Sequence, residues 1–315
     1  MSWDNVADAF KRLSSAPHPQ WEGYLGFYSS WLGGYFREPW AMMVPMDDHG
    51  FHRGDGVFEA GRIVDGAYYD LQEHLLRLKN SAAAVGMELP KSTDEMAKIC
   101  VELARRCQSR EAVLRIYVTR GPGDFSPNPR AVVGHQIYVV LTRWNPPREE
   151  LYQKGASTMI STVSAKAPFW SKIKSLNYLQ NVLMKKECVE KGVDFSISVD
   201  PSGRLCEGAT ENMMMISKQN ELLVPKFDYT LRGTTVRRAM KLAEQITEIK
   251  AIRHSDLFLD DLLEAKEAAF VGTTLGVLPM SRVGDHTLPV GPLCRKLNAL
   301  LQADMKESRE LRTTF

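Results

Sequence analysis

Apolar and polar residues alternate over residues 56–64, which is the pattern of a β-strand with one buried face. The alternation closes at Asp65-Gly66, a dipeptide typical of tight hairpin turns, and Tyr68-Tyr69 begins the expected return strand. Other short apolar runs bounded by turn residues predict further strands. They cover residues 112–119, 136–141, 158–163, 194–199, 213–216, 221–224 and 268–271, and an interrupted strand-like pattern covers residues 28–48.

A period of three to four residues marks the helices. Leucines recur in this way over residues 71–78, which predicts an amphipathic helix that ends near Gly86. Ser92 and Glu95 have the spacing of a capping box, so a second helix is expected to begin there. Further helices are predicted over residues 6–13, 177–191 and 235–245, and from Pro292 onward.

The order of these elements decides between two fold classes. Strands come in runs with helices after them, which favours an α+β fold with mixed or antiparallel sheets over a doubly wound parallel sheet. Two consecutive prolines at 146–147, followed by charged residues, mark a linker. We therefore expect a helical extension over residues 1–24, a smaller domain over 25–143, a linker over 144–155 and a larger domain over 156–315.

Composition narrows the class of protein. The 315 residues include 40 Lys and Arg against 38 Asp and Glu, and this near-balance gives no electrostatic reason to expect binding to nucleic acid or to an anionic membrane surface. No apolar run is long enough to span a bilayer, and the first residues lack the apolar segment of a signal peptide. The five cysteines are scattered without a CxxC pair, which is typical of free thiols in a reducing compartment. We expect a cytoplasmic enzyme.

Two segments contain a side chain that burial would make reactive. Lys172 and Lys174 precede a predicted helix; a desolvated lysine is a usable nucleophile or base, whereas two solvated lysines are the ordinary alternative. Glu207 stands beside Gly208 ahead of an apolar run. Its carboxylate could enter the core, where it would need a cationic or hydrogen-bonding partner, and a polar loop is the alternative.

Two further segments combine glycine with threonine at the ends of predicted elements. Gly233-Thr234-Thr235 opens a helix, and Gly272-Thr273-Thr274 follows a strand. Backbone N–H groups at such places bind phosphate, although ordinary capping by threonine is equally consistent with the pattern.

Histidines raise the question of a metal. Residues 47–55 hold two histidines and three aspartates, but their spacing fits no metal motif and Arg53 would repel a cation, so no metal site is expected. His74 and Arg77 lie one turn apart on the helix predicted from residue 71, where a solvated helix face is the default interpretation.

Six motifs, taken in their order along the chain, resemble those of the class IV aminotransferases, which are fold-type IV enzymes dependent on pyridoxal phosphate. They are His52–Glu59 (HRGDGVFE), His74–Leu78 (HLLRL), Lys174–Tyr178 (KSLNY), Glu207–Asn212 (EGATEN), Leu231–Thr235 (LRGTT) and Gly272–Thr274 (GTT). The resemblance covers about residues 25–310, and the segments 28–56 and 121–125 are most similar to the plant-type D-amino-acid aminotransferase branch. The family also includes branched-chain aminotransferases and aminodeoxychorismate lyases.

The resemblance implies a role for each matching residue in holding pyridoxal phosphate. Lys174, not Lys172, matches the lysine that joins the cofactor aldehyde and moves the α-proton of the substrate, and Glu207 matches the carboxylate that faces the pyridine nitrogen. Arg77 matches the arginine that binds the phosphate, and Tyr178 matches the tyrosine that bonds the ring hydroxyl in branched-chain members. The remaining implied cofactor contacts are Thr210, Asn212, Thr234, Thr235, Thr273 and Thr274.

The resemblance also implies a ping-pong transfer of an amino group from an amino acid to a 2-oxo acid, in a homodimer. A D-amino acid is the expected donor; a branched-chain L-amino-acid aminotransferase, a lyase releasing pyruvate from aminodeoxychorismate and a non-catalytic cofactor-binding protein are the alternatives. Bacterial D-amino-acid members hold the substrate carboxylate with an Arg-x-His pair, of which this chain retains Arg130 without the histidine. Arg53, Arg115 or Arg120 could serve instead, and Phe58 is a further candidate substrate contact.

Overall fold

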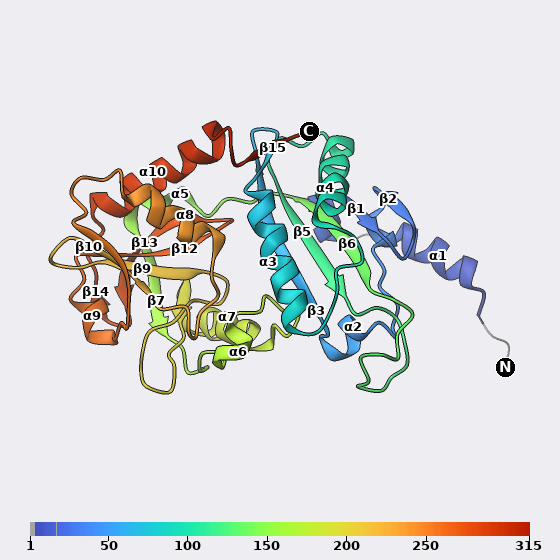
Figure 1. Ribbon diagram of the computed structural model, residues 1–315, viewed down its shortest axis with the longest axis horizontal. Helices are drawn as coiled ribbons and strands as arrows, with labels where there is room; N and C mark the ends of the chain where they lie inside the picture. Colours follow the sequence, from blue (N-terminus) through green and yellow to red (C-terminus); the bar gives the residue numbers. More distant parts are fainter. Residues whose placement is uncertain (1–3, 17) are drawn as a thin grey trace.

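The computed structural model describes residues 4–16 and 18–315, and its strands form two sheets that lie beside each other (Figure 1). The first sheet contains β1 (Tyr24–Ser29), β2 (Gly34–Phe36), β3 (Gly56–Val64), β4 (Ala67–Tyr69), β5 (Ala112–Thr119), β6 (Gln136–Arg143) and β15 (Arg312–Thr314). The second contains β7 (Ala156–Ile160), β8 (Phe195–Ile197), β9 (Asn212–Ile216), β10 (Glu221–Pro225), β11 (Ala251–Ser255), β12 (Glu267–Gly272), β13 (Gly276–Val283) and β14 (His286–Thr287). The helices are α1 (Val6–Ser15), α2 (His49–Arg53), α3 (Leu71–Ala84), α4 (Thr93–Cys107), α5 (Glu149–Lys154), α6 (Pro168–Ser171), α7 (Leu179–Lys191), α8 (Thr234–Ala243), α9 (Leu259–Leu263) and α10 (Pro292–Glu307), with short 3-10 turns at η1 (Pro19–Gly23) and η2 (Pro39–Ala41).

The first sheet is antiparallel throughout, with the strand order β15-β4-β3-β5-β6-β1-β2. Helices α3 and α4 cover one face (Figure 1), and buried side chains from these helices and from β3, β5 and β6 form one core. Along β5, Leu114, Ile116 and Val118 point into this core, so Arg115 and Tyr117 point to the opposite face. That opposite face is therefore available to a site between the two sheets.

The second sheet is mixed, with the order β11-β10-β9-β12-β13-β7-β8 and β14 paired to β13. The outer strands pair in parallel, β7 with β8 and β13, and β10 with β11, whereas β9, β12 and β13 are antiparallel neighbours. Helices α8 and α10 pack on one face and share a second core with β9, β10, β12 and β13. A third apolar cluster includes residues in and around α9.

The two-sheet architecture confirms the predicted α+β class. The hairpin of β3 and β4, helix α3 and strands β5 and β6 lie where the hydrophobic pattern predicts them. The capping box is also present, because the Ser92 hydroxyl accepts from the Glu95 N–H and the Glu95 carboxylate accepts from the Ser92 N–H. Short-range sequence patterns are therefore sufficient to predict these elements.

Several elements were not predicted from the sequence pattern. Strands β11 and β15 are short and polar, and β13 contains Pro279, so none shows a clear alternation. Helix α5 occupies part of the predicted linker 144–155. Strand β15 pairs with β4 through Arg312 and Tyr69 and so joins the first sheet, although it ends the segment 156–315 expected as the larger domain. Backbone pairing at a sheet edge needs no apolar pattern, so an edge strand such as β15 cannot be predicted from hydrophobic alternation.

The helix predicted at residues 6–13 is α1, which projects from the body of the molecule near the N-terminus (Figure 1). Its apolar side chains Val6, Phe10 and Leu13 are exposed, and the rings of Phe10 and Trp40 lie 6.4 Å apart. The expected extension over residues 1–24 includes residues 1–3 and 17, which lie outside the described residues. Among the helices that the structure describes, none has the length and apolar character needed to cross a membrane.

Candidate active site

A cavity of about 430 Å³ lies between the two halves of the chain and is lined by both. The first half contributes β3, β5 and α3, and the second contributes the segment around Lys174, the loop before β9, the start of α8 and the turn between β12 and β13. Glu207 lies in a small adjoining pocket that shares Lys174 and Asn212 with the cavity. The cavity itself collects the other motif residues: Phe58, Arg77, Arg115, Lys174, Tyr178, Thr210, Asn212, Thr234, Thr235, Thr273 and Thr274.

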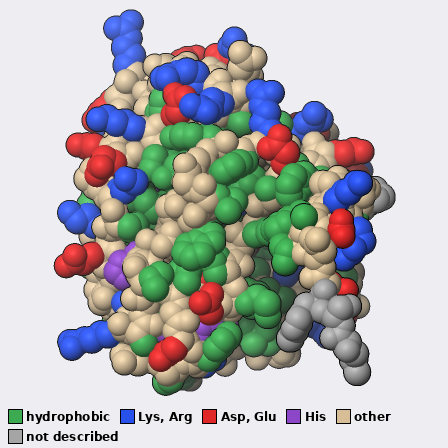
Figure 2. Space-filling view, turned by 90° about the vertical axis from the view of Figure 1, so that its right-hand side faces the viewer, with side chains coloured by type: hydrophobic (Ala, Val, Ile, Leu, Met, Phe, Trp, Pro, Cys, Tyr) green, Lys and Arg blue, Asp and Glu red, His purple; other side chains and the backbone are tan. Residues whose placement is uncertain are grey.

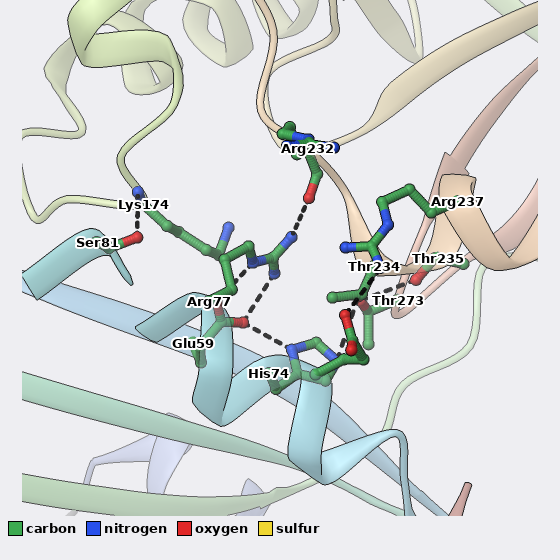
Figure 3. A network of polar contacts seen from close by, with 11 residues as sticks. Glu59, His74, Arg77, Ser81, Lys174, Arg232, Thr234, Thr235, Arg237 and Thr273 are labelled. Carbon is green, nitrogen blue, oxygen red and sulfur yellow. Dashed lines mark hydrogen bonds and ion pairs between the residues drawn. The ribbon is translucent and has the colours of Figure 1, made fainter. Parts of the chain in front are cut away.

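Arg77 is held in place by a buried carboxylate. Its Nε and Nη2 donate to the two oxygens of Glu59 at 2.7 and 2.8 Å, and its Nη1 donates to the carbonyl oxygen of Arg232 at 3.2 Å (Figure 3). Glu59 is completely buried on β3. Burial alone would raise the pKa of its carboxyl, but the charge and hydrogen bonds of Arg77, together with those of His74, hold that pKa at about 2. The guanidinium is therefore oriented by the protein itself.

His74 joins this network and connects it to the second half of the chain. Its Nδ1 lies 2.6 Å from Oε2 of Glu59, and its Nε2 lies 3.5 Å from the hydroxyl of Thr234 at the start of α8 (Figure 3). His74 is buried, so the default interpretation of His74 and Arg77 as a solvated helix face is wrong. The physical reason is Glu59, because a buried carboxylate needs polar or charged partners and both side chains turn inward to meet it.

Lys174 is positioned by backbone pairing between its loop and β3. The Phe58 N–H donates to the Lys174 carbonyl oxygen at 2.9 Å, and the Lys174 N–H donates to the Ser81 hydroxyl at 3.3 Å. The Lys174 amine lies 4.5 Å from the centroid of the Phe58 ring, and burial, together with the nearby charge of Arg77, lowers its pKa to about 8. Lys172 is exposed and does not line the cavity. A cavity amine with such a pKa is a usable nucleophile and base.

Glu207 is the second carboxylate of the site. Its Oε2 accepts from the Leu231 N–H at 2.9 Å and from Nδ2 of Asn212 at 3.4 Å. Burial raises the pKa of Glu207 to about 7, while the Leu231 N–H and the charges of Lys166 and Lys174 oppose that rise. A cation placed beside this carboxylate would favour its ionised form, and the carboxylate would in turn favour the cation.

The start of α8 presents backbone donors to the cavity. Gly233 is the N-cap and has no side chain with which to cap the first N–H groups. A Cβ at Gly233 would lie 2.0 Å from Oδ1 of Asn212, so any larger residue here would displace the Asn212 side chain. The hydroxyls of Thr235 and Thr273 lie 3.1 Å apart, which brings the start of α8 together with the turn after β12 (Figure 3). Such N–H groups at the positive end of a helix dipole form an anion site.

The turn between β12 and β13 is anchored by two residues of the predicted linker. Nε1 of Trp144 donates to the carbonyl oxygen of Thr274 at 3.1 Å, and the Tyr152 hydroxyl donates to that of Leu275 at 2.6 Å. The guanidinium of Arg62 stacks on Trp144, 3.3 Å from the ring centroid. These contacts fix the position of the turn relative to the first sheet.

The four arginines considered for the substrate carboxylate occupy different places. Arg115 lies on β5 and lines the cavity. Arg120 is buried and donates to the two oxygens of Asp55 at 2.8 and 3.0 Å. Arg53 and Arg130 lie on the surface, and neither lines the cavity of this chain. Of these four, Arg115 is the one that a carboxylate in the cavity can reach.

The histidine- and aspartate-rich segment 47–55 has a structural role. Oδ1 of Asp48 accepts from the Gly50 N–H at 2.7 Å and so caps α2, and Oδ2 accepts from the Thr119 hydroxyl at 2.8 Å. Nε2 of His49 lies 2.8 Å from the carbonyl oxygen of Asp124. Within residues 4–16 and 18–315, no three His, Cys, Asp or Glu side chains come together as metal ligands.

Comparison with known proteins decides the family. Residues 56–283 match the model of the family described as amino-transferase class IV. The chain belongs to the class IV aminotransferases. This class IV aminotransferase is 31% identical over 290 residues to the D-amino-acid transaminase, chloroplastic, of Arabidopsis thaliana, covering 90% of this chain and 77% of the relative. It is also 31% identical over 268 residues to the D-alanine aminotransferase of Bacillus licheniformis, covering 82% of this chain and 90% of the relative.

A solved structure shares the fold of this class IV aminotransferase. The branched-chain amino acid aminotransferase of T.th., complexed with N-(5'-phosphopyridoxyl)-L-glutamate, superimposes with a TM-score of 0.84 at 23% identity, covering 92% of this chain and 98% of that one. The fold expected from the resemblance, fold-type IV, is thereby confirmed. As a member of its family, the chain is a transaminase dependent on pyridoxal phosphate.

The donor set of the cavity fits this cofactor. Arg77 and the first N–H groups of α8 suit a phosphate dianion, and the Lys174 amine suits an aldehyde. Glu207, in the pocket that also contains Lys174, suits a protonated ring nitrogen. The phosphate, the aldehyde and the ring nitrogen of pyridoxal phosphate would therefore each find protein groups of matching character in or beside the cavity.

Sequence patterns alone missed the residues that support this site. Glu59, Trp144 and Tyr152 contact residues of the cavity. Glu59 belongs to one of the six motifs, but neither the sequence patterns nor the resemblance assigned a role to any of the three residues. A signal for Glu59 was present: an acidic residue occupies an inward position of the alternating strand 56–64, where burial demands a partner. The contacts of Trp144 and Tyr152 join residues more than a hundred positions apart and leave no such local trace.

Proposed function

We propose that this class IV aminotransferase moves the amino group of a D-amino acid to a 2-oxo acid in a ping-pong sequence, with Lys174 as the catalytic residue. The observation that carries the proposal is the convergence of Lys174, Arg77 and the start of α8 in one cavity, with Glu207 beside it. The names of the two relatives support a D-amino acid as donor, because one is a D-amino-acid transaminase and the other a D-alanine aminotransferase. The acceptor that we propose is 2-oxoglutarate or pyruvate.

The phosphate and ring ends of the site have separate tasks. When bound, pyridoxal phosphate supplies an aldehyde that carries the amino group and a ring that accepts electrons from the α-carbon of the substrate. Glu207 would hold a proton on the ring nitrogen, and Asn212 supports Glu207 by donating to it. Tyr178 and Thr210 line the cavity and would border the ring. The phosphate would be held by Arg77, by the first N–H groups of α8 and by the hydroxyls of Thr234, Thr235, Thr273 and Thr274, all of which line the cavity.

Lys174 moves the proton. Its neutral Nζ removes the proton from the α-carbon of the substrate and later returns one. A pKa of about 8 keeps a useful fraction of the amine neutral near physiological pH, and the protonated form is then available as the acid. Phe58, whose ring lies beside the amine, limits the directions in which Nζ can move.

Arg115 binds the carboxylate of the substrate. It lines the cavity from β5, and Nη1 donates to the Thr142 hydroxyl at 3.0 Å, which fixes one side of the guanidinium. Phe58 and Tyr117, whose ring centroids lie 5.9 Å apart, form an aromatic floor next to it. Arg53 and Arg130 lie on the surface outside this cavity and have no role in the proposal.

A homodimer is the assembly that we propose. Figure 2 shows hydrophobic side chains gathered on the side of the molecule that carries β1, β2 and the nearby loops. Exposed apolar residues of these segments include Trp31, Leu32, Val44, Met46 and Phe51. An exposed apolar patch of this kind is typical of a protein–protein interface. Light scattering should give the mass of two chains, and the mass of one chain would contradict the proposal.

The domain boundaries and the cellular compartment are further proposals, and each rests on its own observation. Residues 25–143 and 156–315 are proposed as the two domains, because each contains most strands of one sheet and most residues of one apolar cluster. Strand β15 is the exception, since it belongs to 156–315 and pairs with the first sheet. The cytoplasm is proposed as the location, because the five cysteines are free and a reducing compartment keeps them so.

A panel of D- and L-amino acids tests the function. D-alanine with 2-oxoglutarate should lose its amino group only when the acceptor is present, and Lys174→Ala should abolish the transfer while circular dichroism stays unchanged. Transfer from L-leucine but not from D-alanine would instead favour a branched-chain aminotransferase, the activity named for the structural relative. Pyruvate release from aminodeoxychorismate without acceptor would indicate a lyase, and no conversion of any donor would indicate a non-catalytic cofactor-binding protein.

A further inference from the structure

The small pocket beside the cofactor cavity contains a second lysine. Lys166 is half-buried and lines this pocket together with Glu207 and Lys174. Among the described residues that line the small pocket, these two lysines carry the basic side chains. Lys166 does not line the cofactor cavity and has no part in the contacts proposed above.

The backbone next to Lys166 is fixed relative to the segment that carries Glu207. The Ala165 N–H donates to the Val199 carbonyl oxygen at 2.9 Å, and the Ser198 N–H donates to the Glu207 carbonyl oxygen at 2.9 Å. The segment that contains Ser198 and Val199 therefore pairs with the loop of Lys166 on one side and with the segment of Glu207 on the other. Paired backbones of this kind hold the side chains that they carry at a defined separation.

The amine of Lys166 lies over an aromatic ring inside the site. Its Nζ is 5.2 Å from the centroid of the Tyr178 ring, and Tyr178 lines both the cofactor cavity and the small pocket. An ammonium at this distance from an aromatic face is attracted by the ring. Burial lowers the pKa of Lys166, and the charge of Glu207 opposes that change.

Glu207 has few other sources of positive charge. Its hydrogen-bond donors, a backbone N–H and a side-chain amide, are neutral. Lys174 has another task in the proposed function, because its amine joins the aldehyde of the cofactor. Glu211 lines the same pocket and adds negative charge, which favours the protonated form of Glu207. Lys166 is therefore the amine of this pocket that is free to favour the carboxylate form.

We propose that Lys166 is a positioning residue that keeps Glu207 ionised, so that the proton between Glu207 and the ring nitrogen of pyridoxal phosphate stays on the nitrogen. The inference rests on the proposed function, which places Glu207 beside that nitrogen. In an enclosed site, burial favours the neutral pair, in which the carboxyl keeps the proton. A cation beside the carboxylate opposes that transfer. Lys166 thus acts through Glu207 and contacts neither the substrate nor the cofactor in this assignment.

The resonance of the ring nitrogen reports where the proton lies. The holoenzyme is prepared with pyridoxal phosphate that carries nitrogen-15 in the ring, since protonation of a pyridine nitrogen moves its NMR resonance upfield. Lys166→Met keeps most of the hydrocarbon but removes the charge, and we expect a downfield shift toward the neutral pyridine. Lys166→Arg keeps the charge and should retain the resonance of the wild type. An unchanged resonance in Lys166→Met would overturn the inference.

Two further variants complete this series. Lys172→Met is the matched control, because Lys172 is exposed and lines neither the cofactor cavity nor the small pocket, and it should leave the resonance unchanged. Lys166→Gln is a second neutral variant, with the same downfield shift expected, in case circular dichroism shows that Lys166→Met does not fold.

Infrared spectroscopy of the cofactor-free protein gives a readout without the cofactor. The carbonyl band of a neutral carboxyl is separate from the bands of a carboxylate, and its loss in Glu207→Gln identifies the contribution of Glu207. Removal of a nearby cation raises the pKa of a carboxyl. In Lys166→Met the proton concentration at which Glu207 is half ionised should therefore fall at least about tenfold. An unchanged midpoint would also overturn the inference.

The inference and the proposed function fail in distinguishable ways. If the ring nitrogen resonance moves in Glu207→Gln but not in Lys166→Met, Glu207 keeps its proposed place and the role of Lys166 alone is overturned. If the resonance moves in neither variant, Glu207 does not hold the proton of the ring nitrogen, and both proposals for this end of the site are overturned.

Discussion

Three ionisable side chains around the cofactor cavity meet different balances of burial and charge. Glu59 is buried but bonded to Arg77 and His74, which keeps its pKa near 2 and makes it a permanent anion. Lys174 and Glu207 have no oppositely charged side chain at hydrogen-bonding distance. Burial therefore lowers the pKa of Lys174 to about 8 and raises that of Glu207 to about 7. Groups that titrate near the working pH suit proton transfer, whereas a permanent charge suits orientation.

Glu59→Gln should weaken cofactor binding although Glu59 itself does not line the cavity. The variant keeps the shape of the side chain but loses the charge that orients Arg77, and breaking a buried ion pair destabilises by about 3–5 kcal/mol. We expect the dissociation constant for pyridoxal phosphate, measured by fluorescence titration, to rise at least about tenfold. Glu264→Gln, which alters an exposed pair with Lys218, is the control. An unchanged constant would contradict the orienting role.

Lys174 should become reactive at a lower pH than an ordinary lysine. Because its pKa is lowered to about 8, the neutral amine appears as the pH rises through that value. Competitive labelling of the cofactor-free protein with acetic anhydride, read by peptide mass spectrometry, should show a midpoint near pH 8 for Lys174. Exposed Lys172, two residues away, serves as internal reference. A midpoint near 10 for Lys174 would disprove the shift.

At the scale of elements, the site depends on connections between segments rather than on any one of them. The loop carrying Lys174 pairs with β3, and the isolated bridge between Val57 and Ser175 extends that pairing. The linker holds the turn after β12 through Trp144 and Tyr152. Rigid support of this kind is what keeps binding groups in place when they lie on turns.

Tyr152→Phe should loosen the turn after β12 without altering the cavity lining. It removes one hydroxyl that donates to the Leu275 carbonyl oxygen, a contact of about 0.5–1.5 kcal/mol. The dissociation constant for pyridoxal phosphate should rise about two- to tenfold. Tyr229→Phe is the control, because Tyr229 does not line the cofactor cavity. It should leave the dissociation constant for pyridoxal phosphate unchanged. Equal constants in both variants would show that the linker does not support the turn.

At the scale of the whole molecule, the proposed cofactor site lies between the two sheets and is lined by both halves of the chain. Arg77 belongs to a helix packed on the first sheet, while α8 and Glu207 belong to the second half of the chain. A ligand bound by both halves stabilises the folded chain by mass action, by about 2.7 kcal/mol at a hundred times its dissociation constant. Without the ligand, the buried carboxyl of Glu207 lacks the ring cation that the proposed function places beside it, and its pKa is raised to about 7.

The cofactor-free protein should lose stability as the pH rises. The pKa of Glu207 is raised from 4.5 to about 7 in the folded chain, so its contribution is complete below about 4.5 and is lost as the pH passes about 7. Asp70, with a pKa of about 6, acts in the same direction, so the comparison is made with Glu207→Gln. Urea unfolding should give wild type and Glu207→Gln similar free energies of unfolding at pH 5. At pH 8 the free energy of unfolding of the variant should exceed that of the wild type by up to about 3 kcal/mol. Parallel pH dependences would rule out this role for Glu207.

Local patterns in the sequence determined much of this protein. The alternation before Asp65-Gly66 specified the hairpin, the Ser92–Glu95 spacing specified the start of α4, and glycine with threonine at 233–235 indicated the anion site at the start of α8. Each of these depends on residues close together in the chain, where backbone geometry alone fixes which groups meet.

Only the tertiary structure decided which distant groups meet. It placed Lys174 rather than Lys172 in the cavity, brought Arg115 there rather than Arg53, and buried Glu59 against Arg77. Periodicity tells which face of an element is buried, but the partner on that face is set by strand order and register, which join residues far apart in the chain. Burial then fixes the charge states, because the pKa of a side chain follows from the groups packed around it.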